Sequence, residues 1–141
     1  MTRPRLLGLD YGARRIGVAL SDEGRRLARP HSLLHHRGWT PSARAVEDLL
    51  KQLDAEYVVL GLPYGMDDQV GSQAQEVLGF AEALRRRGIR VEMQDERLTS
   101  LEAGDILREQ GHTWQRSKAL VDQVAAALIL QAYLDQTPHT P

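Results

Sequence analysis

Three acidic residues lie where the local sequence holds a carboxylate in place. Asp10 ends an apolar run over 6–9, and Glu96 follows a short apolar run over 89–93. Asp122 is nearly the only charge in an apolar helical stretch, which is costly unless the charge is paired or coordinated. Carboxylates without Cys or His partners favour hard cations. The three acids therefore predict a site for one or two ions of Mg²⁺ or Mn²⁺.

Such a site would suit phosphodiester hydrolysis. Two ions about 3.5–4 Å apart can activate a water and stabilise the leaving oxygen. Each acid also has a simpler explanation. Asp10 could cap a turn, Asp95 could cap the next helix, Glu96 could pair with Arg97, and Asp122 could be a satisfied core acid.

The elements that position these acids form an α/β pattern. Apolar runs predict strands over 6–9, 16–20, 27–34, 57–62 and 89–93. Helical spacing predicts helices over 41–53, 72–87 and 118–134, with a further one from Thr99 or Ser100 to Gly111. Three hairpin-linked strands followed by alternating helices and strands predict a mixed five-stranded sheet with helices on both faces.

Local features refine this arrangement. The continuous apolar run 57–62 is typical of a strand buried on both faces, and Pro30 favours an edge or a break. Thr40 before Pro41 predicts a helix cap. Asp122 shares a helix face with small alanines, so its carboxylate is expected to face the sheet.

Length and composition limit the possible classes of protein. The 141 residues, 42% of them hydrophobic, predict a single domain over 1–141 with a frayed tail over 136–141. There is no cysteine and no run of about 18 apolar residues. No signal peptide is recognised, so we expect a cytoplasmic protein with no membrane partner. His35 and His36 would point to opposite faces of a strand, which disfavours a shared metal ion.

Four segments together resemble the YqgF (RuvX-like) family. They are Gly8-Leu-Asp-Tyr-Gly-Ala-Arg-Arg-Ile-Gly-Val-Ala, Gly61-Leu-Pro-Tyr-Gly-Met-Asp, Asp95-Glu-Arg-Leu-Thr-Ser and the apolar stretch 121–134, and they occur in family order. The chain departs from the pattern at Ala13, where Thr or Ser is frequent, and at Tyr64, Gly65 and Asp68. These departures bear on substrate preference more than on catalysis.

The resemblance implies an RNase H-like fold and a metal-dependent endonuclease. It assigns catalysis and metal binding to Asp10, Glu96 and Asp122, and it places Arg15 and Arg97 where they hold a phosphate or a catalytic acid. Two tasks are attributed to the family, maturation of the 5′ end of precursor 16S rRNA and resolution of Holliday junctions. Tyr11, Gly12 and Asp95, beside the acids, are candidate supporting residues.

The arginine-rich composition suits phosphate recognition, although a skewed genomic base composition would give the same bias. Only Lys51 and Lys118 of the 18 basic residues are lysines, and the net charge is −1. Our hypothesis is that basic groups contact the nucleic-acid backbone on either side of the cleaved bond. These groups are Arg14, Arg15, Arg85, Arg86, Arg87, Arg116 and Lys118.

Two alternatives remain open at this point. Asp10 to Gly17 fits the Asp-x-Gly-x-x-x-x-Gly pattern of an actin-like or sugar-kinase phosphotransferase, but 141 residues hold only one of its two domains. A non-catalytic nucleic-acid-binding module would keep the fold, but it gains nothing from three converging acids. Phosphate contacts do not distinguish RNA from DNA. A four-way junction would call for a homodimer, whereas trimming of rRNA would not.

Overall fold

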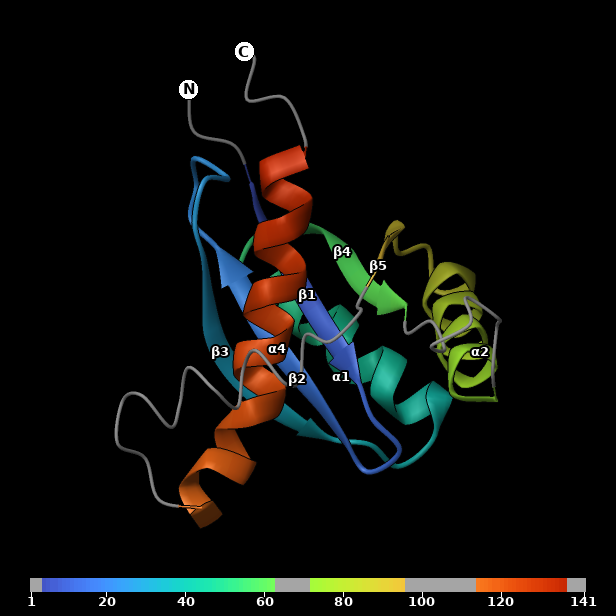
Figure 1. Cartoon of the computed structure of the whole chain (residues 1–141). Helices are drawn as coiled ribbons and strands as arrows, with labels where there is room; N and C mark the ends of the chain where they lie inside the picture. The colour runs from blue at the N-terminus through green and yellow to red at the C-terminus, as the bar shows by residue number, and fades with distance from the viewer. Residues whose placement is uncertain (1–3, 63–71, 96–113, 137–141) are drawn as a thin grey trace.

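The computed structural model describes residues 4–62, 72–95 and 114–136. The strands are β1 (Arg5–Tyr11), β2 (Arg15–Ser21), β3 (Ala28–His35), β4 (Ala55–Leu62) and β5 (Val91–Asp95), and the helices are α1 (Trp39–Gln52), α2 (Ser72–Arg86) and α4 (Trp114–Gln136) (Figure 1). Every predicted element within these ranges is present, with ends shifted by a few residues. The helix predicted up to Gly111 lies outside the described residues.

The five strands form one mixed sheet in the order β3-β2-β1-β4-β5. β1 pairs antiparallel with β2 and parallel with β4, and β4 pairs parallel with β5. β3 is an edge strand, as Pro30 predicted. Its register against β2 shifts so that Val18 pairs with Ser32 while the next residue, Ala19, pairs with Pro30. The missing donor of Pro30 is therefore tolerated at an irregular edge.

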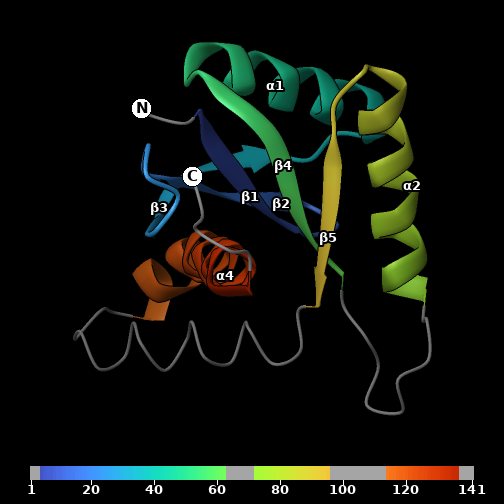
Figure 2. The ribbon, with the colours of Figure 1, turned by 90° about the horizontal axis from the view of Figure 1, so that it is seen from above.

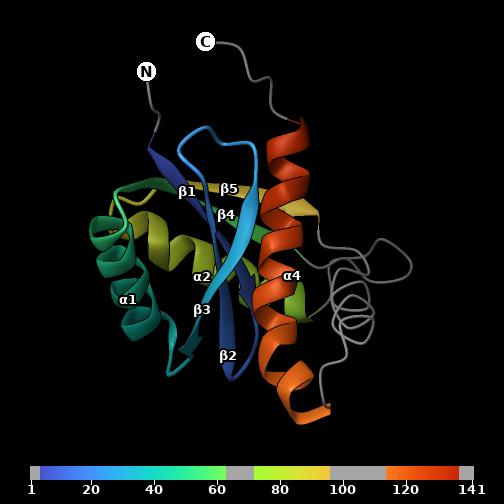
Figure 3. The same cartoon turned by 90° about the vertical axis from the view of Figure 1, so that its left-hand side faces the viewer.

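Helices cover both faces of the sheet. Seen from above, α1 and α2 lie on one face and α4 lies on the other (Figure 2). From the side, α4 runs beside β2 and β3, and it also contacts β1 (Figure 3). No helix in the three described ranges is long and apolar enough to cross a membrane.

Successive side chains of β1 point to opposite faces of the sheet, which explains why two separate cores form. Leu7, Leu9 and Tyr11 pack into the core beneath α1 and α2. Leu6, on the other face, packs into the core beneath α4. β4 contributes to both cores, with Val58 on the first side and its neighbours on the second, so its apolar run is continuous.

The start of α1 corrects one prediction. The helix begins at Trp39, and its N-cap is Gly38 without a side-chain cap hydrogen bond, so Thr40 is not the cap. Gly38 has a φ of 119°, which a glycine adopts without steric cost. Pro41 then lies in the first turn, where its missing N–H is tolerated. The earlier start places the Trp39 side chain beside β1.

Candidate active site

Asp10 is held on the α4 face of the sheet. It lies near the C-terminal end of β1, is only 6% exposed, and pairs with Gly17 of β2 across the antiparallel ladder. It stands two residues from Gly8, where an added Cβ would meet Leu130 and Ala126 of α4. Alternation along the strand therefore directs Asp10 toward the same helix.

Gly17 is a second point at which α4 packs closely on the sheet. A Cβ at this position would overlap the backbone carbonyl of Asp122. Directly opposed residues of an antiparallel pair have Cβ positions roughly 4.5–5.5 Å apart. The helix backbone at Asp122 therefore passes within side-chain reach of Asp10. The sheet and the helix therefore place these two predicted acids on neighbouring elements.

Arg15 forms an ion pair with Asp122. Its Nε lies 3.1 Å from Oδ2 of the carboxylate, and the two side chains are 35% and 23% exposed. Burial raises the pKa of the Asp122 carboxyl above its ordinary value, and the charge and hydrogen bond of Arg15 oppose this rise. Asp122 is therefore a paired acid on the protein interior side of α4. The resemblance had placed Arg15 beside a phosphate or a catalytic acid, and here it holds a predicted catalytic acid.

The other predicted site residues are only partly placed. Glu96 and Arg97 lie outside the described residues. β5 ends at Asp95, the neighbour of Glu96, and Asp95 is exposed and pairs with Leu62 of β4. Gly12 and Arg14 lie in the turn between β1 and β2, and Arg14 is exposed.

Arg116 and Lys118 belong to the first turns of α4. The structure does not describe their side chains. Their predicted contact with nucleic acid stays a prediction.

The arginine run at the end of α2 is placed away from the acids. Arg85 donates a hydrogen bond to the carbonyl of Val91, 3.2 Å away. Arg87 pairs with Glu47 of α1 at 2.8 Å. These side chains support the connection from α2 into the start of β5, at the opposite end of the parallel strands from Asp10. This arrangement does not favour the hypothesis that they contact substrate.

The donor set fits a hard cation but is incomplete. In the three described ranges, no group of three or more His, Asp or Glu residues could hold a metal ion. Asp10 and Asp122 supply two carboxylates from facing elements, and carboxylate oxygens suit Mg²⁺ and Mn²⁺. Both ring nitrogens of His36 are engaged, Nε2 with Tyr11 Oη at 2.9 Å and Nδ1 with Ser42 Oγ at 2.7 Å.

Sequence reasoning missed an aromatic cluster on the opposite face of β1. Tyr11 follows Asp10 and packs its ring against His36 and Phe80, with centroids 4.8 and 5.2 Å away. Trp39 Nε1 donates a hydrogen bond to Tyr11 Oη at 3.2 Å. Burial raises the pKa of the Tyr11 phenol and lowers that of the His36 imidazole. The sequence signal was Trp39, which lies two residues before the predicted helix 41–53.

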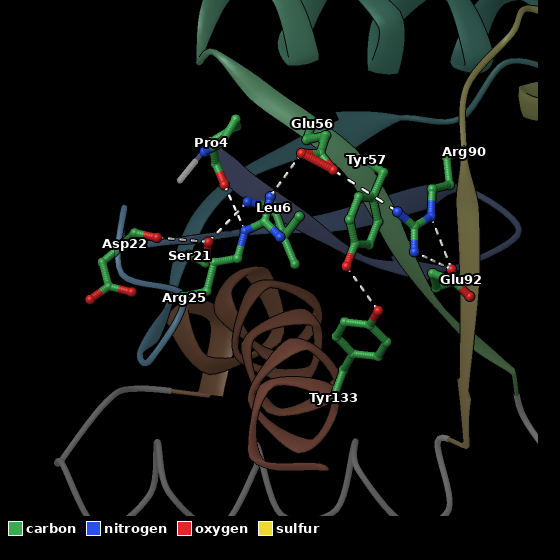
Figure 4. A network of polar contacts seen from close by, with 10 residues as sticks. All are labelled: Pro4, Leu6, Ser21, Asp22, Arg25, Glu56, Tyr57, Arg90, Glu92 and Tyr133. Carbon is green, nitrogen blue, oxygen red and sulfur yellow. Dashed lines mark hydrogen bonds and ion pairs between the residues drawn. The ribbon is translucent and has the colours of Figure 1, made fainter. Parts of the chain in front are cut away.

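A second polar network, the tyrosine network, lies under the other end of α4 (Figure 4). It comprises Arg25, Glu56, Tyr57, Arg90, Glu92 and Tyr133. Tyr57 Oη hydrogen-bonds with Tyr133 Oη at 2.9 Å, and the guanidinium of Arg90 lies 4.0 Å from the Tyr57 ring centroid. Burial, together with the contact with Tyr133, raises the pKa of Tyr57 to about 12.

Arginine and glutamate alternate around this ring. Arg25 lies 3.1 Å from Glu56, and Arg90 lies 2.8 Å from Glu92. The network therefore balances its own charges.

Solved structures with this arrangement identify the fold. The structure of T. thermophilus RuvC in complex with a Holliday junction substrate aligns with a TM-score of 0.60 at 15% identity, over 96% of this chain and 98% of that one. The Holliday junction resolvase of fowlpox virus aligns with a TM-score of 0.56 at 14% identity, over 94% and 99%. The chain therefore has an RNase H-like fold, as predicted.

Sequence comparison identifies the family. The family model described as "RuvX: Holliday junction resolvase" matches residues 4–136. A relative from Anaeromyxobacter sp. (strain Fw109-5) is 43% identical over 93% of this chain and 96% of its own length. Another, from Thermosynechococcus vestitus (strain NIES-2133 / IAM M-273 / BP-1), is 40% identical over 96% and 90%. Both relatives carry the name "Putative pre-16S rRNA nuclease". The chain belongs to the RuvX (YqgF) family.

Proposed function

We propose that this protein is a metal-dependent endonuclease that hydrolyses phosphodiester bonds in structured nucleic acid. The observation that carries the proposal is the close approach of the α4 backbone at Asp122 to Gly17, the β2 residue that pairs with Asp10. A protein that only binds phosphate gains nothing from acidic residues on both of these elements. A nuclease uses them to hold cations.

Asp10 and Asp122 would hold Mg²⁺ or Mn²⁺, and Glu96, which follows the end of β5, would complete the set. When bound, the cation supplies positive charge that activates water and stabilises the charge developing on the phosphate. Arg15 orients the Asp122 carboxylate through their ion pair, and its charge opposes the rise in the pKa of Asp122 that burial causes.

Family membership supports the proposed substrate class. The family model is described as a Holliday junction resolvase, and the curated relatives are named for precursor 16S rRNA. We therefore propose 5′-end maturation of precursor 16S rRNA, junction resolution, or both. Arg14, exposed in the turn beside Asp10, would contact the backbone phosphates.

A cleavage assay with two substrates tests the activity. Wild type is compared with Asp10→Asn and Asp122→Asn on a precursor rRNA fragment and on a four-way DNA junction, with Mn²⁺ or Mg²⁺. Loss of a cation ligand removes several kcal/mol of transition-state stabilisation, which corresponds to a rate loss of roughly 1000-fold. Asp48→Asn, at an exposed position of α1, is the matched control and should cleave normally.

Activity that survives both site substitutions would contradict the catalytic assignment. Binding without any cleavage would favour the non-catalytic module. Junction cleavage further predicts a symmetric homodimer, because the junction itself has two-fold character. Light scattering on the protein with and without junction DNA measures this.

A further inference from the structure

A cavity lies on the face of the sheet opposite the acids. It has a volume of about 520 Å³ and is lined by Tyr11, Ala13, His36, Gln73 and Glu76. Tyr11 directly follows Asp10 on β1, so the two side chains leave the same strand end on opposite faces. A nucleic-acid strand bound at Asp10 therefore needs only to pass the β1–β2 turn to reach this cavity. Its size lies within the roughly 300–1,000 Å³ typical of ligand pockets.

Tyr11 and His36 are the aromatic residues of the cavity lining, and Trp39 adjoins them through a hydrogen bond to Tyr11. Tyr11 Oη hydrogen-bonds with His36 Nε2 and accepts from Trp39 Nε1, so the three rings are tied together. A Cβ at Gly79 of α2 would overlap the six-membered ring of Trp39, which shows how closely the indole lies on that helix. Even so, Trp39 is 41% exposed. An indole that is fixed in place and open to solvent loses little entropy when a planar group stacks on it.

The polar lining distinguishes a base from a phosphate. Glu76 contributes a carboxylate to the cavity, and its charge contributes to the raised pKa of the Tyr11 phenol. This negative charge repels phosphate. Carboxylates accept hydrogen bonds from base amino groups, and glutamine amides pair with adenine edges. Gln73 and Glu76 therefore suit the edge of a base, while the aromatic side chains suit its face.

We propose that this cavity binds an unpaired nucleobase of the substrate strand, next to the phosphodiester bond held at Asp10 and Asp122. The inference rests on the proposed function, because it assigns the base to the same strand that the acids cleave. Single-stranded RNA is recognised in this way, by stacking on aromatic side chains and hydrogen bonding to base edges. The substrate class is therefore nucleic acid with unpaired nucleotides beside the cleavage position, such as a precursor RNA tail.

Equilibrium binding without divalent cations tests the cavity independently of cleavage. The probes are a fluorescein-labelled single-stranded RNA octamer, the same sequence as a duplex, an octamer with abasic sites, and nucleoside monophosphates. Trp39→Ala should weaken binding of the single strand by about 5- to 150-fold, the range for loss of one base–aromatic stack. Binding of the duplex and of the abasic octamer should change less than twofold.

Matched variants separate stacking from damage to the fold. Trp39→Phe keeps a ring and should restore most of the binding, and Leu78→Ala, at an exposed apolar position of α2, should leave binding unchanged. Glu76→Gln should alter the preference among octamers of different base composition. Glu82→Gln, on the exposed side of the same helix, should not. Thermal melting of each variant shows that it is folded.

Three outcomes would overturn the inference. They are equal losses for single strand and duplex in Trp39→Ala, no loss for either, and nucleoside monophosphates binding as tightly as the octamer, which would assign the cavity to a free nucleotide. A wild-type protein that shows the Trp39 effect but cleaves nothing would support the cavity and contradict the proposed function. Cleavage by a protein without the Trp39 effect would do the reverse.

Discussion

Helix α4 meets the sheet at two polar places that balance their charges differently. Under its C-terminal half, Tyr57 lies near Arg25 and Arg90, and each of these arginines pairs with a glutamate. Nearer its start, the backbone at Asp122 lies against Gly17, the β2 partner of Asp10, and the Asp122 carboxylate pairs with Arg15. The first place is a network that supports the fold. The second holds a partly buried carboxylate whose pKa is raised by burial, which is typical of a functional site.

The largest stability effect is expected from Tyr57→Ala. Tyr57 is 4% exposed, and truncation of a buried aromatic side chain costs about 3–5 kcal/mol. Urea unfolding measures the loss. Because the change lies at the far end of α4 from the acids, the cleavage rate per folded molecule should stay at the wild-type level. A rate that falls as steeply as at Asp10→Asn would remove the distinction between the two places.

Gly17→Ala should damage both stability and activity. The added methyl group overlaps the carbonyl of Asp122, so α4 must shift, at a cost of about 1–3 kcal/mol. A shift of about 1 Å at a catalytic group can lower the rate roughly 100-fold. Gly24→Ala is the matched control, since the nearest atom to its Cβ would be 3.7 Å away. Equal behaviour of the two variants would show that the close approach of α4 is unimportant.

Tyr57→Phe should cost less and alter the pH dependence of stability. Loss of the hydrogen bond to Tyr133 removes about 1 kcal/mol. The pKa of Tyr57 is about 12 in the folded protein and 10.0 in the unfolded chain. The folded state therefore keeps this proton more tightly, and its stabilising effect declines as the pH rises from about 10 to about 12. The free energy of unfolding, measured with denaturant across that pH range, should decline less steeply in the variant than in wild type.

Arg15→Ala should have the smallest effect on stability and a clear effect on Asp122. The pair is partly exposed, so its loss costs at most about 1 kcal/mol. Without the guanidinium, the pKa of Asp122 should rise further above its ordinary value, because only burial then acts on it. An NMR titration of the side-chain carboxyl in the metal-free protein measures this, with Arg14→Ala as control. An unchanged pKa would show that Arg15 does not govern this acid.

The sequence predicted those features of the two polar places that depend on the local pattern of apolar residues. The run 57–62 identified the doubly covered strand β4, and the spacing of Asp122 with its alanines predicted an acid that faces the sheet. The position of Asp10 at the end of a strand was predicted from the apolar run that precedes it. Periodicity alone is sufficient for such features, because each depends on which face of an element is buried.

Contacts between distant elements could not be predicted in this way. The approach of Asp122 to Gly17 depends on the crossing of α4 over β2, and the pairing of Tyr57 with Tyr133 joins residues 76 positions apart. The start of α1 at Trp39 depends on the backbone conformation of Gly38, which overrode the expected cap at Thr40. These features come from tertiary packing, about which local propensity carries no information.

The central claim is that Asp10 and Asp122 hold a divalent cation. Its most direct test is isothermal titration calorimetry of the protein with Mn²⁺ in the absence of nucleic acid. We expect saturable binding by wild type and by the Asp48→Asn control. Asp10→Asn and Asp122→Asn should each bind at least about tenfold more weakly, because each removes a direct carboxylate ligand, and even supporting residues of a metal site typically contribute 10–100-fold. Mn²⁺ binding of wild-type strength in both site variants would contradict the account.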